Sequence, residues 1–399
     1  MLKKILLASF VFLGCFHEAG ALDEVSWRQD IDYFAQELPK RHIQLFYQLP
    51  RSTFESELLS VRQDLPKLSD KQVQLRLQQI AAQVGDLHTR LILNRGSIFP
   101  ITLAYFGDEV HVVAVLHDQL KHLLGASLVG IDNANINDIV EKASTLISAE
   151  NKFAKKFFLP SMMRDAESIH FLKITQTLAH AKFKFQSNGK ILEVELDSLE
   201  PSSSMNWIRS QTSTPLSRSH PTEIYWYKYL DESRALYINY ARCEDRKDLP
   251  FRTFVKAIAN TMDQVTVDKV ILDLRTNPGG REDVILPLIY ELKKRNVKVM
   301  VLIGNGTFSS AFGNALTIKH QLNGVLVGEP TGQKPNAFGE VETFTLPNSR
   351  IKVQFSTKYW RRIASADPDA LYPDLAVETS IGEYMIGMDT VLEKALVLE

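Results

Sequence analysis

The sequence predicts an α/β protein in which parallel strands alternate with helices, and three observations carry this prediction. Residues 270–274 form a short, mostly apolar and β-branched run that ends at the turn N-P-G-G of 277–280, as buried parallel strands do. Residues 282–295 place apolar side chains at helical spacing, which predicts a crossover helix. Residues 299–303 form a second apolar run that ends at G-N-G. Both loops are therefore expected at one edge of a sheet, where ligands bind.

The two loops carry the parts of a nucleophilic site. Ser309 lies where the second strand gives way to a helix predicted over 307–319, and the free N–H groups of a helix N-terminus favour negative charge. Gly279 and Gly280 offer backbone N–H groups that no side chain shields. Together these features fit a serine nucleophile that faces an oxyanion hole. A simpler interpretation, a helix cap and a turn, stays open from these residues alone.

Three motifs follow one another in this part of the chain: D-L-R-T-N-P-G-G at 273–280, T-F-S-S-A at 307–311 and V-G-E-P-T-G at 327–332. In order and spacing they resemble the C-terminal processing (tail-specific) serine peptidase family, which includes the tricorn core protease and the retinoid-binding modules of the interphotoreceptor protein. The resemblance covers roughly residues 75–380. It implies a catalytic domain of the ClpP/crotonase-like ββα type and peptide-bond hydrolysis through an acyl-enzyme, without a metal or an organic cofactor.

The resemblance also assigns roles to residues of the two loops. Ser309 takes the position of the nucleophile. The backbone N–H groups of Gly279 or Gly280, and of Ser310 after the nucleophile, take the position of the oxyanion hole.

His88 is the expected general base. It stands in the run V-G-D-L-H-T-R of residues 84–90, between a predicted helix and a predicted strand, where a lone histidine can equally be a surface loop residue. The family resembled here carries an Asp-x-His-Ser/Thr motif at this place, and in tricorn-like members the matching histidine is the base. A neutral imidazole suits that role at neutral pH.

Lys334 is the competing base. Many members of the family are Ser-Lys dyad enzymes whose lysine lies in this loop, but a lysine base needs burial that depresses its pKa by several units. Lys334 precedes Pro335 where the dyad enzymes have a glycine, and Phe312 stands where they commonly carry a glutamate. The sequence therefore favours His88, and the dyad hypothesis stays open as the alternative.

The resemblance further implies a carboxylate that orients the histidine. Tricorn-like members carry it a few residues before a Pro-Asp-Ile/Leu strand, and the matching stretch is S-A-D-P-D-A-L-Y-P-D-L at 365–375. Asp367 is the matching position, and Asp369 is the alternative acid. Family members often have glutamate here, and aspartate is one methylene shorter. These residues can also be solvated loop acids beside prolines.

The start of the chain predicts export. Residues 1–21 combine a basic start, a short apolar core and the small residues A-G-A at 19–21, which is typical of a secretory signal peptide. The apolar run is too short to span a bilayer, so no stable membrane insertion is expected after cleavage. A lipoprotein attached through Cys15 is the weaker alternative to a periplasmic or secreted protein.

The remaining sequence predicts the division of the chain into regions. These are a signal peptide at 1–21, a helical N-terminal region at 22–84, a β-rich segment at 85–199, a polar linker or mobile loop at 200–222 and the catalytic domain at 223–399. Residues 125–140 within the β-rich segment resemble the latter part of a PDZ domain, a module that binds peptide tails by strand addition. The upstream Gly-Leu-Gly-Phe-type loop is missing, so the segment is either a PDZ-like module or a degenerate one.

Composition limits the expected partners. The chain is 45% hydrophobic and 23% charged with a formal net charge of −1, which is typical of a soluble globular protein and gives no sign of a surface for nucleic acid. The expected partner is a polypeptide or peptide substrate, and the oligomeric state stays open. The alternative from another class is a non-catalytic ligand-binding scaffold of the same fold.

Overall fold

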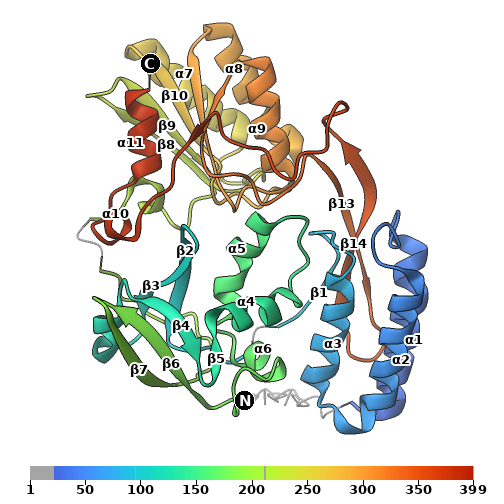
Figure 1. Ribbon diagram of the computed structural model, residues 1–399. Helices are drawn as coiled ribbons and strands as arrows, with labels where there is room; N and C mark the ends of the chain where they lie inside the picture. Colours follow the sequence, from blue (N-terminus) through green and yellow to red (C-terminus); the bar gives the residue numbers. More distant parts are fainter. Residues whose placement is uncertain (1–21, 95, 211–212, 399) are drawn as a thin grey trace, which may run out of the picture.

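The structure is a computed structural model and describes residues 22–94, 96–210 and 213–398. The predicted signal peptide and Cys15 lie outside the described residues. Within those ranges, no helix combines the length and the apolar character needed to cross a membrane. Figure 1 shows an N-terminal group of helices, a lower β-rich part and an upper part built on a second sheet.

The N-terminal helices pack against a long β-hairpin that comes from near the C-terminus (Figure 1). The helices are α1 (Glu24–Arg41), α2 (Arg51–Asp64), the 3-10 turn η1 (Leu65–Lys67) and α3 (Asp70–Ala82). The hairpin is β13 (Asn336–Thr345) and β14 (Lys352–Arg361), with β1 (Arg90–Ile92) paired to the other side of β14. Phe344, Val353 and Phe355 of the hairpin share an apolar core with the helices, so this C-terminal segment is fixed to the N-terminal region.

The β-rich part is an antiparallel sheet of order β2-β3-β4-β6-β7, with β5 beside β4. Its strands are β2 (Ile101–Phe106), β3 (Glu109–Val115), β4 (Ser127–Ile131), β5 (Ala134–Asn135), β6 (His180–Ser187) and β7 (Lys190–Asp197). Its helices are η2 (Asp118–Leu123), α4 (Ile136–Ser144), α5 (Lys152–Met162) and α6 (Ala166–Phe171). Helix α5 reaches the upper part, because Phe157 and Phe158 contact the ring of Phe308.

The upper part is a sheet of order β15-β12-β11-β10-β9-β8, parallel from β9 to β15 and antiparallel at β8. Its strands are β8 (Tyr225–Leu230), β9 (Ala235–Tyr240), β10 (Lys269–Asp273), β11 (Lys298–Ile303), β12 (Val325–Gly328) and β15 (Leu375–Ala376). The helices and turns that follow residue 213 are η3 (Leu216–Arg218), α7 (Phe251–Gln264), η4 (Glu282–Ile285), α8 (Leu286–Arg295), α9 (Ser309–Gln321), α10 (Ile381–Met385) and α11 (Thr390–Val397).

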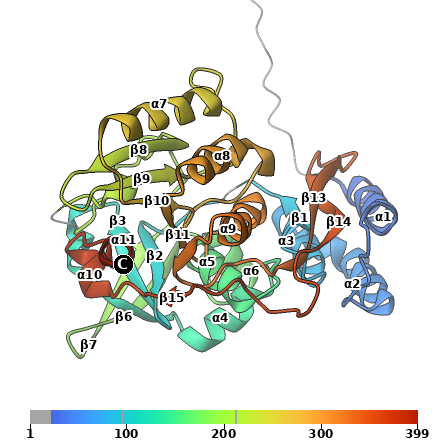
Figure 2. The same cartoon turned by 90° about the horizontal axis from the view of Figure 1, so that it is seen from above.

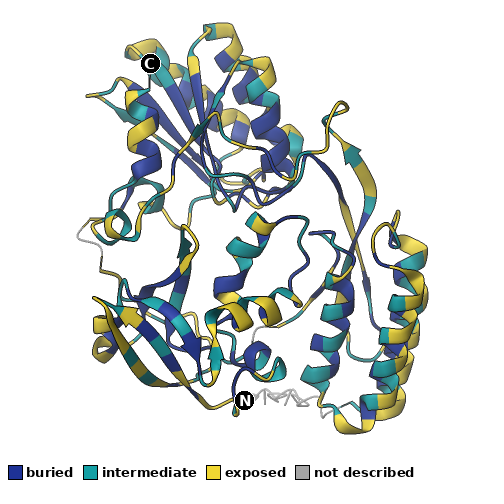
Figure 3. Cartoon of the chain, in the orientation of Figure 1, coloured by how far each residue is buried: buried dark blue, intermediate teal, exposed yellow. Residues whose placement is uncertain are grey.

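This sheet is covered on both faces, which explains why its central strands are apolar throughout. Helices α7, α8 and α9 pack on one face and α11 packs on the other (Figure 2). Figure 3 shows the strands as the most buried elements of the upper part. Parallel strands buried on both faces are expected to be continuous apolar runs, as residues 270–274 and 299–303 are. The predicted α/β fold is confirmed.

Two features differ from the sequence predictions. The helix predicted over 282–295 divides into η4 and α8, because Pro287 stands in the first turn of α8, a position that suits proline and marks a helix start. The hairpin of β13 and β14 was not predicted. Part of its period-two alternation is present in the sequence, since the buried Val353 and Phe355 alternate with the less buried Lys352 and Gln354, and that pattern is typical of a strand.

Candidate active site

Ser309 occupies a sharp turn between strand and helix. β11 ends at Ile303, as the sequence predicts, and α9 begins at Ser309, two residues after the predicted helix start. The backbone φ of Ser309 is +50°, a left-handed conformation that is uncommon outside glycine and costs energy for a residue with a side chain. The N–H of Ser309 donates to the side-chain oxygen of Gln333, a buried residue. The nucleophile candidate is therefore held by a side chain that the sequence analysis did not identify.

The glycine loop after β10 lies directly against this turn. A Cβ on Gly279 would lie 2.6 Å from Cβ of Ser309 and 2.9 Å from N of Ser310, and Gly279 and Gly280 have φ values of +102° and +136°. Only glycine meets both demands. Oγ of Ser310 donates to O of Gly280 at 2.5 Å, which ties the two loops together.

The predicted oxyanion donors do not have equivalent surroundings. The N–H of Gly279 donates to Oδ1 of Asn277 at 2.9 Å, and Nδ2 of Asn277 donates to O of Tyr240 at 2.6 Å. Asn277 thus fixes the loop and engages one of the predicted donors. Gly280 and Ser310 are the two that remain for a substrate oxygen.

His88 lies in the same cavity as Ser309. A cavity of about 440 Å³ is lined by Ser309, Ser310, Gly280 and His88, together with residues of β13 and the loop after β14. The His88 side chain is 11% exposed, and its backbone O accepts from Nε2 of Gln354 on β14 at 2.8 Å. The fold therefore brings together residues that lie far apart in the sequence, and the hairpin closes one side of the cavity.

Asp86 is a buried carboxylate beside the His88 ring. Its Oδ1 accepts the N–H of His88 at 2.9 Å and lies 3.6 Å from Nδ1, while its Oδ2 accepts from Oγ1 of Thr89 at 2.5 Å. Nε2 of His42 lies 3.2 Å from the same Oδ2, and Nδ1 of His42 accepts the N–H of Gln44, so the His42 proton is on Nε2. Burial alone would raise the pKa of Asp86, but the hydrogen bonds from His42, His88 and Thr89 outweigh burial and hold the pKa far below its usual range,.

Glu150 is a second acid at the same ring. Its Oε2 accepts the N–H of Lys334 at 3.2 Å. Burial raises the pKa of Glu150 to about 8, and the Asp86 charge acts in the same direction. Burial lowers the pKa of His88, but the adjacent Asp86 carboxylate outweighs burial, and the pKa of His88 is raised above its ordinary value. The three groups therefore form one electrostatic unit.

The acids expected from the C-terminal stretch have other partners. Oδ2 of Asp367 accepts from Nζ of Lys334 at 3.0 Å, and Oδ1 of Asp369 accepts from the Tyr372 hydroxyl at 2.9 Å. Nδ1 of His88 has no hydrogen-bond partner among the described residues, so neither acid holds the ring in this structure. Asp367 and Lys334 form an ion pair at the surface, as an exposed carboxylate and an adjacent ammonium do,.

Lys334 lacks the surroundings of a base. Burial lowers its pKa, but the hydrogen bond to Asp367 outweighs burial, so the pKa of Lys334 is raised above its ordinary value. A lysine base requires a depressed pKa. Lys334 is instead held as an ammonium.

Asp86 and Glu150 differ in how far the sequence could reveal them. Asp86 stands two positions before His88, within the motif that pointed to the histidine. Glu150 lies in the loop between α4 and α5, outside all the motifs, and only the fold brings it to His88.

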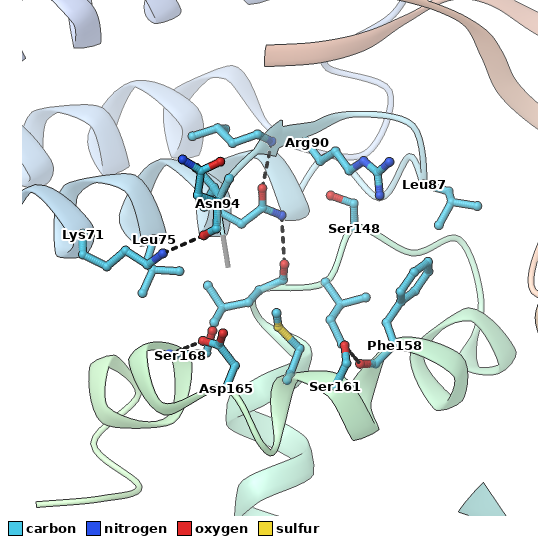
Figure 4. Close-up of a pocket in the computed structure, with 16 residues that line it drawn as sticks. Lys71, Leu75, Leu87, Arg90, Asn94, Ser148, Phe158, Ser161, Asp165 and Ser168 are labelled. Atoms are coloured by element: carbon cyan, nitrogen blue, oxygen red, sulfur yellow. Dashed lines mark hydrogen bonds between the residues drawn. The ribbon is translucent and has the colours of Figure 1, made fainter. Parts of the chain in front are cut away.

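A second cavity of about 300 Å³ lies between α3, β1, α5 and α6 (Figure 4). Leu87 and Arg90, which flank His88, and Ser148, which precedes Glu150 by two positions, line it. Gln78 bridges the same two segments, since its Nε2 donates to O of Leu146 at 2.9 Å and its Oε1 accepts the N–H of Leu91 at 2.9 Å. This cavity therefore lies behind the segments that carry His88 and Glu150.

Comparisons with solved structures identify similar folds. A mutant of CPAF gives a TM-score of 0.66 at 13% identity, covering 94% of this chain and 96% of that chain. Mature CPAF in complex with lactacystin gives 0.62 at 13% identity, covering 94% and 98%. The photosystem II D1 C-terminal processing protease gives 0.42 at 12% identity, covering 92% and 98%. No protein-family model and no curated protein matches the sequence. The CPAF likeness establishes the fold, which is the α/β fold that the sequence motifs predicted.

Proposed function

We propose that the chain is an exported serine peptidase in which Ser309 attacks the peptide carbonyl and His88 moves the proton. The observation that supports this most strongly is the shared cavity of Ser309, His88, Gly280 and Ser310. These residues come from three motifs of the sequence, which pointed to the oxyanion donors, the nucleophile and the base. The positive φ of Ser309 and the close approach of the glycine loop are further support, because such local strain is retained where function requires it.

Asp86 is the acid that we assign to His88 in place of Asp367. A base histidine needs a carboxylate that holds its ring and stabilises the imidazolium that forms. Asp86 is held ionised 3.6 Å from Nδ1, whereas Asp367 is half exposed and paired with Lys334. The 3.6 Å separation exceeds a hydrogen bond. Catalytic hydrogen bonds often tighten only when substrate is bound.

The proposed reaction runs in two steps. Oγ of Ser309 forms a bond to the carbonyl carbon as its proton passes to Nε2 of His88, and the N–H groups of Gly280 and Ser310 hold the oxyanion. The C–N bond then breaks, and the leaving amine takes the proton from His88. A water attacks the resulting ester, gives its proton to His88 and releases the acid, which restores the Ser309 hydroxyl. No step uses a metal or cofactor.

The test combines fluorophosphonate labelling with turnover of dye-labelled casein, using the purified mature chain. The wild-type chain should react with the fluorophosphonate and hydrolyse casein, and Ser309→Ala should do neither. In His88→Ala the rates of labelling and of hydrolysis should both fall by at least about 1,000-fold, as they do in other serine hydrolases that lose their base. Ser202→Ala is the matched control, because Ser202 lies in the exposed polar loop. Retained turnover in Ser309→Ala would refute the proposal.

A non-catalytic ligand-binding scaffold is the second candidate. The cavity of Figure 4 favours it, since its walls are largely apolar and include Leu75, Leu91 and Ile147, which is the lining expected of a small-molecule pocket. Absence of both labelling and turnover in a folded wild-type chain, with binding of an apolar fluorescent probe that Leu75→Arg abolishes, would favour this function over the peptidase.

A further inference from the structure

The Nδ1 side of His88 faces more acidic groups than a base histidine needs. One carboxylate suffices to orient such a ring. Here a carboxylate oxygen of Asp86, a ring nitrogen of His88 and a carboxylate oxygen of Glu150 all lie within 4.8 Å of one another, and Nδ1 is the nitrogen that lies 3.6 Å from Oδ1 of Asp86. Asp86 and His88 come from the turn after α3, and Glu150 comes from the loop between α4 and α5. The second acid has no role in the reaction derived above.

Two of these three atoms are buried without a hydrogen-bond partner among the described residues, Nδ1 of His88 and Oε1 of Glu150. The other oxygen of Glu150 is engaged, since Oε2 accepts the N–H of Lys334. Buried polar atoms in folded proteins normally have a partner. Both atoms belong to the same cluster of three residues. A cation that accepts an electron pair from each of them would satisfy both at once.

The surroundings of Asp86 resemble the outer shell of a metal site. Thr89 and His42 donate to Oδ2, which leaves a lone pair of Oδ1 available beside the N–H of His88. The tautomer of His42 is fixed by Gln44, so this support is directional. Ligating carboxylates in proteins are commonly held by such hydrogen bonds, which fix their orientation.

We propose that Oδ1 of Asp86, Nδ1 of His88 and Oε1 of Glu150 bind a divalent transition-metal ion of the zinc type, and that this ion inactivates the base. One imidazole and two carboxylates form a ligand set that zinc accepts, with a water in the fourth position. Zinc bonds of about 2.1 Å require the three atoms to draw together, and Oε1 of Glu150 can approach without breaking a hydrogen bond of its own, because it has no partner among the described residues.

The ion would block proton transfer by fixing the histidine tautomer. A neutral imidazole bound through Nδ1 carries its remaining proton on Nε2. Nε2 then has no lone pair for the proton of Ser309. This half of the inference rests on the proposed function, whereas metal binding does not.

The experiment is a calorimetric titration of zinc chloride into the full mature chain, dialysed against a chelator and free of substrate. Wild type should bind one equivalent, and Glu150→Gln should bind at least about tenfold more weakly, since loss of even an outer-shell partner costs 10- to 100-fold in metal affinity. Glu109→Gln is the matched control, because Glu109 also lies beside a histidine, His111. It should leave the zinc affinity unchanged, since Glu109 is exposed and belongs to no group of three possible metal ligands among the described residues. His88→Ala should also weaken zinc binding. It provides the test of the site if Glu150→Gln fails to fold.

Equal affinity in wild type, Glu150→Gln and His88→Ala, or no saturable binding to wild type, would overturn the site. A casein assay on the same samples then separates the two ideas. If wild type is active and saturating zinc leaves its rate unchanged, the inactivation is refuted while the peptidase stands. If zinc binds as expected and the metal-free chain has no activity, the peptidase proposal fails while the metal site stands.

Discussion

The two halves of the proposed site are built in different ways. The nucleophile half consists of the loops after β10 and β11, and the hydrogen bonds that hold it come from backbone groups and from the uncharged side chains of Asn277, Ser310 and Gln333. The base half is assembled around His88 from Asp86, Glu150 and His42, all of them titratable and largely buried. One half is therefore defined by shape and the other by charge.

This difference decides how each half can fail. A shape-defined loop tolerates changes of pH and salt but has no room for an added carbon atom. A charge-defined cluster accepts a substitution by a side chain of the same size. Its stability and activity depend on which members hold protons, because burial makes each unpaired charge costly. Substitutions that alter only charge, or only shape, should therefore separate the two halves.

The largest effect is expected from a change of charge at Asp86. Asp86→Asn keeps the size of the side chain but removes the charge that faces Nδ1 of His88, so turnover should fall by about 10,000-fold, as the same change of a triad carboxylate does elsewhere. Asp367→Asn is the matched comparison, because it makes the same change at an exposed carboxylate that bonds to Lys334, and it should lower turnover by no more than about twofold. The measurement is kcat/KM on a fluorogenic peptide. The reverse order of the two losses would return the acid to Asp367.

The second effect tests shape alone. Gly280→Ala places a Cβ 2.4 Å from O of Cys243, at a φ of +136°, so the loop must shift away from Cys243 and the N–H of residue 280 is displaced. Such a shift should lower kcat by about 100-fold, with about 1–3 kcal/mol of lost stability from backbone strain. Gly382→Ala is the control, since a Cβ there meets only Oγ of Ser380 at 3.9 Å. Full activity in Gly280→Ala would show that this loop does not hold the oxyanion.

The contrast between the two halves also explains how much of each could be predicted from the sequence. The nucleophile half is encoded locally, because a strand, a glycine turn and the next strand occupy one continuous stretch from Lys269 to Ala311. The motifs in that stretch predicted the parallel sheet and the positions of Ser309 and Gly280. His88 was predicted from the motif around it.

The acid of the base half is where the sequence prediction and our proposal differ. Asp367 was chosen by its distance from a later motif, but its carboxylate lies beside Lys334. Glu150 reaches His88 because the loop between α4 and α5 lies against α3, a contact that Gln78 makes through Leu146 and Leu91. No local pattern records such a long-range contact, so the charge network could be found only in the folded chain.

A third and smaller effect concerns pH and stability. The folded-state pKa of Glu150 is raised to about 8, so between its ordinary value and pH 8 the folded chain holds a proton that the unfolded chain has released. Stability should therefore fall as pH rises across that range, by up to about 1.4 kcal/mol per pH unit for one proton. The raised pKa of His88 acts in the same direction.

Urea unfolding of wild type and Glu150→Gln at pH 5 to 8 measures this effect. The variant cannot titrate at this position, so its free energy of unfolding should decline less steeply with pH. Glu109→Gln is again the control, because that acid is exposed. Identical slopes in wild type and Glu150→Gln would mean that Glu150 is not buried with a retained proton, and the charge-defined half would then rest on Asp86 alone.

The smallest effect is expected at Lys334, where the two hypotheses for the base differ most. Lys334→Met keeps the apolar stem and the backbone N–H that donates to Glu150 and removes only the ammonium paired with Asp367. Because both partners are partly exposed, the ion pair contributes at most about 1 kcal/mol. kcat/KM should therefore change by less than about twofold, and the pH at which activity reaches half its maximum should stay where His88 sets it. A Ser-Lys dyad requires the opposite result, since removal of its base would abolish turnover and leave the His88→Ala variant active.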